Sequence, residues 1–132
     1  MKYLLDTHSL IWAITEPKKL SAKARALIES SDEHIMVSAI TFWEISLKYS
    51  IGKLHLENIA PEDFPSICQR MDIEILPLDA AVCANYHKLN AFFHKDPFDR
   101  MLIWLAKSQN FALISRDETV KLYESIGITV VW

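Results

Sequence analysis

The stretch Lys2-Tyr3-Leu4-Leu5-Asp6 has the pattern of a short buried strand that ends at an acidic residue. Four further apolar runs along the chain have the length of strands, and segments with helical spacing separate them. Strands that alternate with helices predict an α/β fold with a mainly parallel sheet and helices on both faces. The further strands are expected at residues 34–38, 73–76, 111–115 and 128–132.

The helices are placed by their apolar spacing and by residues that commonly begin or end helices. Ser and Asp are favoured caps, Pro suits the first turn, and Gly often follows the last turn. Either Ser38 or Thr41 opens the helix that contains Glu44. Helices are expected at residues 8–14, at 21–29, up to Gly52, at 61–71 and 80–92, in a segment through 101–106, and from Asp117 onward.

Length and composition indicate one globular domain over residues 1–132. The 51% hydrophobic and 23% charged residues are ordinary values for such a domain. The two cysteines, Cys68 and Cys83, lie in apolar helical contexts without the spacing of a zinc site, so we expect reduced core residues. No apolar stretch has the length of a signal sequence or a membrane span, and we therefore expect a cytoplasmic protein with no membrane partner.

Four acidic residues lie where an expected strand ends or on the helix that follows it. In a parallel sheet the carboxyl ends of the strands meet at one edge, so these side chains are expected to converge. Carboxylates that converge repel one another, and a divalent cation relieves the repulsion. With oxygen donors alone, the expected ion is Mg²⁺ or Mn²⁺. The four acids are Asp6, Glu44, Asp99 and Asp117.

Each acid also has a purely structural interpretation. Asp6 and Asp117 suit the N-cap of a helix, and Asp99 suits the first turn, where a negative charge complements the helix dipole. Glu44 follows Thr41 by three residues, as in a capping box, and this alternative is favoured for Glu44 taken alone. Capping alone, however, does not predict that the four side chains converge.

A site of this kind suits hydrolysis of phosphodiester bonds, because bound metal generates hydroxide from water and stabilises the transition state. The sequence lacks GxSxG, GxxxxGK[ST] and GxGxxG, which gives no support for an elbow serine, a P-loop or a dinucleotide site. The net charge of −3 provides no general basic surface for nucleic acid. Bound cations reverse the local charge, so a nucleic-acid substrate is not excluded.

Five stretches, spread over essentially the whole chain, together have the pattern of one protein family. They are LLDTHSLIW at residues 4–12, SAITFWEISLKYSIGKL at 38–54, HKDPFDRMLIWLA at 94–106, LISRD at 113–117 and the closing ITVVW.

These stretches resemble PIN-domain ribonucleases of the VapC type, the toxin half of toxin–antitoxin pairs. The resemblance implies a three-layer sandwich with strand order 3-2-1-4-5. It also implies a metal-dependent endoribonuclease that acts on RNA, is usually a homodimer and is inhibited by a small antitoxin. In the family's pattern the catalytic and metal-binding acids correspond to Asp6, Glu44 and Asp99, with Asp117 acting directly or through water.

Four neighbouring residues are secondary candidates. Thr7 and Ser115 lie beside the acids, where their hydroxyls bond either metal-bound waters or a phosphate, or only the local backbone. Asp96 is a candidate to cap its helix or to orient Arg100. Arg100 is in turn a candidate to approach RNA phosphates or to pair with Asp96.

Two alternatives come from other functional classes. A phosphoacceptor receiver module has a similar length and an acid after the first strand, but it needs an Asp closing the third strand, where this chain has Pro77 and Leu78. A PIN-like domain that only binds is the second alternative, and the presence of all four acids argues against it.

Overall fold

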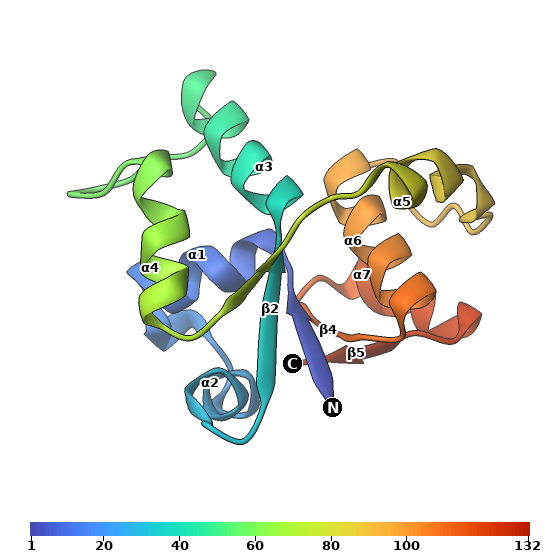
Figure 1. The fold of residues 1–132 in the computed structure, drawn as a ribbon, viewed down its shortest axis with the longest axis horizontal. Coiled ribbons are helices and arrows are strands. Elements are labelled where there is room, and N and C mark those ends of the chain that lie inside the picture. The colour runs from blue at the N-terminus through green and yellow to red at the C-terminus, as the bar shows by residue number, and fades with distance from the viewer.

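A fully parallel sheet of five strands forms the centre of the molecule (Figure 1). The structure is a computed structural model and describes residues 1–132. Strand β1 lies in the middle of the order β3-β2-β1-β4-β5, which confirms the predicted order. The strands are β1 (Lys2–Leu5), β2 (His34–Ser38), β3 (Glu74–Leu76), β4 (Ala112–Ile114) and β5 (Thr129–Val131).

The helices lie on both faces of the sheet, as expected. In Figure 1, α1, α2 and α4 lie to one side of the sheet, while α5, α6 and α7 lie to the other. Four short 3-10 turns continue or connect them. The α-helices are α1 (Thr7–Thr15), α2 (Ala22–Glu29), α3 (Ala39–Ser50), α4 (Phe64–Arg70), α5 (Ala80–Asn85), α6 (Pro97–Gln109) and α7 (Glu118–Lys121); the 3-10 turns are η1 (Pro17–Lys19), η2 (Pro61–Asp63), η3 (Tyr86–Lys88) and η4 (Leu122–Ile126).

Two apolar cores, one on each face, hold the layers together. Successive side chains of a strand point to opposite faces. Leu4 of β1 accordingly packs with Leu102 of α6, whereas Leu5 packs in the other core with Leu10 of α1 and Phe64 of α4. The three layers are therefore helix, sheet and helix.

Helix α5 is shorter than the sequence predicts. The helix expected at residues 80–92 ends at Asn85 and gives way to η3 and a loop. The carbonyls of Leu89 and Ala91 accept hydrogen bonds from the guanidinium of Arg100 instead of continuing a helix. The prediction over 86–92 was wrong because a contact distant in sequence determines the local conformation.

The cysteines differ from each other. Cys68 is buried in the core of α4, and burial raises the pKa of its thiol to about 11, so it is unreactive at neutral pH. Cys83 is exposed on α5, and the prediction that it belongs to the core was wrong. None of the helices is both long enough and apolar enough to span a bilayer.

Candidate functional site

Asp6 lies at the junction of the central strand and the first helix. Its backbone N–H donates to the carbonyl of Ile114 on β4, 3.1 Å away, and its side chain caps α1 by accepting from the N–H of Ser9 at 2.9 Å. The residue is 5% exposed. Burial raises the pKa of Asp6, although Ser115 and Ser9 offset part of the effect. Capping therefore occurs together with an unfavourable buried charge.

Glu44 is buried on α3 and does not form the capping box. Ser38 is the N-cap of α3 and accepts from the N–H of Ile40 at 3.2 Å. The hydroxyl of Thr7 donates to Glu44 Oε1 at 2.5 Å, and Lys48 forms an ion pair with Glu44 Oε2. The favoured structural interpretation of Glu44 was therefore wrong, because its carboxylate points across to α1 rather than back to its own helix end.

Asp96 and Asp99 open helix α6. Asp96 is the N-cap, and its Oδ1 accepts from the N–H groups of Phe98 and Asp99 at 2.9 and 3.0 Å. Asp99 lies in the first turn with its side chain 21% exposed, and its Oδ2 is 3.6 Å from Nε2 of His94. The capping role predicted for Asp96 is confirmed, while Asp99 is left without a close hydrogen-bond donor for its carboxylate.

Asp117 follows β4 and is the exposed member of the group. It is the N-cap of α7, and its Oδ1 accepts from the N–H of Thr119 at 2.7 Å. The hydroxyl of Ser115 accepts from the backbone N–H of Asp117 at 3.1 Å, which is the local backbone role considered for Ser115. Ser115 also lowers the pKa of Asp6 through a side-chain hydrogen bond, and Thr7 contacts the carboxylate of Glu44 rather than the local backbone.

The electrostatics of Asp99 show that these acids converge. Its pKa rises from an ordinary 3.8 to about 7, first because it is buried and then because of the negative charges of Asp96, Asp6, Glu44 and Asp117. We call these five residues the acidic cluster. The charges that raise the pKa of Asp99 include the three other predicted acids, which supports the expected convergence, and Asp96 is a fifth acid near them.

The acidic cluster is not a closed cage for a metal ion. No group of three or more His, Cys, Asp or Glu side chains is arranged to hold one as it stands. The donors are carboxylate oxygens, which suit Mg²⁺ and Mn²⁺, and Mg²⁺ commonly keeps several waters and binds through one or two carboxylates. The donor chemistry fits such an ion, with Asp6 and Asp99 carrying the carboxyl groups whose ionised form is disfavoured.

Arg100 does not take either role considered for it. Its side chain is buried, with the residue 4% exposed, and it makes no ion pair with Asp96 or any other acid. Its guanidinium donates only to uncharged oxygens: the hydroxyls of Tyr86 and Tyr123 and the backbone carbonyls of Leu89, Ala91 and His94. Arg100 is thus a structural residue that anchors the segment before α6.

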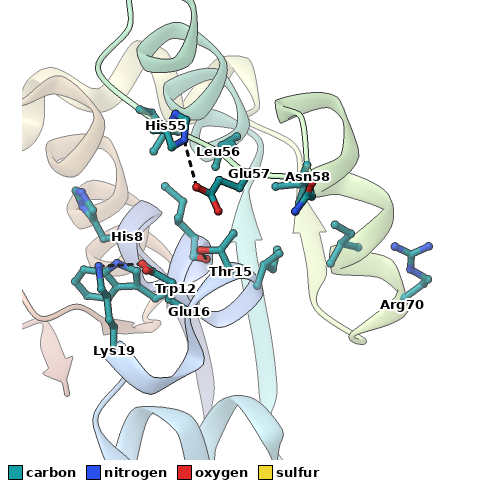
Figure 2. Close-up of a pocket in the computed structure, with 15 residues that line it drawn as sticks. His8, Trp12, Thr15, Glu16, Lys19, His55, Leu56, Glu57, Asn58 and Arg70 are labelled. Atoms are coloured by element: carbon teal, nitrogen blue, oxygen red, sulfur yellow. Dashed lines mark hydrogen bonds and ion pairs between the residues drawn. The ribbon is translucent and has the colours of Figure 1, made fainter.

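An open groove runs alongside α1, next to a smaller hollow that two members of the acidic cluster line. A cavity of about 410 Å³ at the cluster is lined by Asp6, Asp117 and Arg116, and also by His8 and Trp12. The last two residues also line a larger groove of about 870 Å³ between α1, the 54–59 segment and α4, shown in Figure 2. Asp6 and Asp117 therefore line a hollow that lies beside this groove.

Residues 3–124 match the sequence model of the PIN-domain family. The chain belongs to the PIN-domain family. The receiver alternative is wrong, because the family match covers nearly the whole chain. Ribonuclease VapC22 of Mycobacterium tuberculosis is 25% identical to this PIN-domain chain over 129 residues, which are 98% of the chain and 97% of that protein.

Solved structures share the fold at low sequence identity. VapBC2 from Rickettsia felis, bound to a DNA fragment from its promoter, has a TM-score of 0.67 at 18% identity and covers 99% of this chain and 98% of its own. FitAcB from Neisseria gonorrhoeae has a TM-score of 0.64 at 20% identity, with 98% and 96% covered. VapBC-1 from nontypeable Haemophilus influenzae has a TM-score of 0.63 at 20% identity, with 99% and 97% covered.

One neighbour of the acids was not predicted from sequence. The contact of His94 with Asp99 crosses Pro97, where the chain turns into α6, and spacing alone gave no reason to pair the two residues. The ion pair of Lys48 with Glu44, in contrast, follows from their spacing of four residues on a helix.

Proposed function

We propose that this protein is a Mg²⁺- or Mn²⁺-dependent endoribonuclease that acts as the toxin of a toxin–antitoxin pair. The observation that carries the proposal is the acidic cluster, in which a half-buried Asp99 with a pKa of about 7 faces four other carboxylates. Such an arrangement is costly without a cation, and perturbed carboxyl groups of this kind are typical of functional sites.

In this proposal Asp6 and Asp99 bind the ion, Glu44 and Asp117 complete the site directly or through water, and Asp96 holds the end of α6. The capping bonds of Asp6, Asp96 and Asp117 all use Oδ1, so these carboxylates are fixed in place by the backbone. The carboxylate of Glu44 is held instead by the side chains of Thr7 and Lys48. A bound divalent ion would supply a hydroxide nucleophile and stabilise the charge that develops on the phosphate.

The substrate and partners of the proposal draw on the comparisons and on the open access to the site. The relative from Mycobacterium tuberculosis is named a ribonuclease, and a groove that opens at the surface suits a polymer such as RNA. The structural neighbour from Klebsiella pneumoniae is described as a toxin–antitoxin complex. On this basis we propose a small antitoxin as inhibitor. The resemblance of the sequence to VapC-type proteins is the basis for proposing a homodimer, and the lack of a signal or membrane segment in the sequence is the basis for proposing the cytoplasm as the location.

The proposal is tested by cleavage of RNA with purified protein, with Mg²⁺ or Mn²⁺ and after addition of a chelator. Asp6→Asn should reduce cleavage by at least about 100-fold, because loss of a metal-binding carboxylate removes several kcal/mol of transition-state stabilisation. Asn is as good an N-cap as Asp, so the fold should be kept.

Asp79→Asn is the matched control, because Asp79 caps α5 through the N–H of Val82 just as Asp6 caps α1, yet it is not in the acidic cluster. Asp79→Asn should cleave at the wild-type rate. Wild-type protein that binds RNA but never cleaves it with either ion would favour a binding-only PIN-like domain. Equal cleavage by the Asp6 and Asp79 variants would refute the site assignment.

A further inference from the structure

His94 carries the only buried side-chain polar atom in the molecule that has no hydrogen-bond partner, its Nε2. This atom lies 3.6 Å from Oδ2 of Asp99, just beyond hydrogen-bond range. Buried polar atoms are almost always paired, and an unpaired one calls for a specific explanation. The atom also faces a carboxylate of the acidic cluster, so the explanation concerns the site.

The hydrogen bonds around Tyr123 determine which nitrogen of His94 carries the proton. The hydroxyl of Tyr123 accepts from Nη1 of Arg100 at 2.8 Å and from the backbone N–H of His94 at 3.4 Å. A tyrosine hydroxyl has one proton to donate, and its remaining partner is Nδ1 of His94 at 3.0 Å. Nδ1 is therefore the acceptor, and in the neutral ring the proton is on Nε2, the atom that faces Asp99.

Arg100 keeps this arrangement in place. Its guanidinium, which cannot lose its proton, holds the hydroxyl of Tyr123 and also the backbone carbonyl of His94, at 3.4 Å. The ring of His94 is also packed against the ring of Tyr123, with centroids 5.4 Å apart. A chain of contacts in space thus links Arg100 to Tyr123, Tyr123 to His94 and His94 to Asp99.

We propose that His94 is a positioning residue, which donates a hydrogen bond from Nε2 to Oδ2 of Asp99 and so leaves the other oxygen of Asp99 for the cation. The proposal rests on the metal-dependent function proposed above. The terminal torsion of an aspartate has a broad minimum, so a small rotation of the carboxylate is enough to close 3.6 Å to a hydrogen bond. Partners that orient a metal ligand typically contribute 10- to 100-fold to metal affinity.

Substitution of His94 by Asn or by Gln distinguishes the roles of its two ring nitrogens. The amide nitrogen of Gln reaches the position of Nε2, whereas that of Asn reaches only the position of Nδ1. The affinity for Mn²⁺ is measured by calorimetry on the intact protein without RNA. His94→Asn should weaken Mn²⁺ binding about 10-fold or more, and His94→Gln should stay within about 3-fold of wild type. His87→Asn, at an exposed position on η3, is the control and should bind like wild type.

Unchanged Mn²⁺ affinity in folded His94→Asn would overturn the proposal, as would equal weakening by Asn and Gln, which indicates a merely structural role. Wild-type protein that binds no Mn²⁺ would overturn the proposed function itself, so the two failures are distinguishable.

The wild-type protein offers a test that does not depend on any variant folding. Nitrogen-15 NMR of the imidazole of His94 distinguishes the two neutral tautomers. We expect the proton on Nε2, with Nδ1 as the acceptor, both without metal and with Mg²⁺. A proton on Nδ1 in the neutral ring would contradict the proposal, because Nε2 could not then donate to Asp99.

Discussion

Asp99 and Arg100 are neighbours in the first turn of α6, and the protein treats their charges in opposite ways. Arg100 is almost fully buried, and five uncharged oxygens surround its guanidinium. Asp99 is more exposed, yet it faces four other carboxylates, and its pKa rises to about 7. The positive charge is satisfied by the protein itself, whereas the negative charge is left for something else to compensate.

The degree of burial alone does not tell which of these two charged residues has a functional role. A buried charge in which every nitrogen has a hydrogen-bond partner stabilises a local structure, here the segment from η3 to α6. A less buried charge among like charges weakens the fold, and such strain persists where a ligand relieves it. We propose that the functional residue of the pair is Asp99, whose charge its own protein compensates poorly.

The largest change in the stability of the protein is expected for a variant of Arg100. Arg100→Met should destabilise the protein by about 3–5 kcal/mol, because it leaves several buried oxygens without a donor. Urea unfolding measures the change. Arg25→Met is the control, since Arg25 pairs with Glu29 on an exposed face of α2 and should cost less than about 1 kcal/mol. If Arg100→Met lost as little stability as Arg25→Met, the hydrogen bonds of Arg100 would not stabilise the fold as proposed.

Asp99 is expected to make a smaller contribution to stability, and this contribution depends on pH. The folded protein holds the proton of Asp99 up to about pH 7, whereas the unfolded chain loses it near 3.8. The folded state thus binds more protons in this window, so the contribution of Asp99 to stability falls as the pH rises from about 4 to 7 and is constant above it. The full pKa shift corresponds to a loss of stability of at most about 4 kcal/mol. Because Asp99 is partly exposed, we expect a loss of about 1–3 kcal/mol.

Asp99→Asn isolates this contribution, because it removes one titration and leaves the others in place. The stability of wild type minus that of the variant, measured by urea unfolding without metal, should become more negative between pH 4 and 7. A difference that is constant over this range would mean that Asp99 is not held among like charges.

The same contrast explains what the sequence could predict. Asp6 and Asp117 follow predicted strands, and Asp99 lies in the first turn of a helix marked by Pro97, so strand order alone brings these acids to one edge. The helix containing Glu44 was also expected. Local patterns carry this information because each acid lies next to the element that positions it.

Contacts distant in sequence could not be predicted. The capping-box pattern of Thr41 and Glu44 was misleading because the hydroxyl of Thr7, 37 residues away, takes the carboxylate. The partners of Arg100 lie between 6 and 23 residues away and include backbone carbonyls, whose availability depends on where α5 ends. Such contacts leave no periodic signal in the sequence.

The central claim is that the acidic cluster exists to hold a divalent cation, and one comparison tests it most directly. The free energy of unfolding of wild type and Asp99→Asn is measured at pH 8 with a chelator and with excess Mn²⁺. We predict that the variant is the more stable protein without metal. Mn²⁺ at about 100 times its dissociation constant should stabilise wild type by about 2.7 kcal/mol and the variant far less. A variant that is less stable without metal, or that gains as much from Mn²⁺ as wild type does, would contradict the claim.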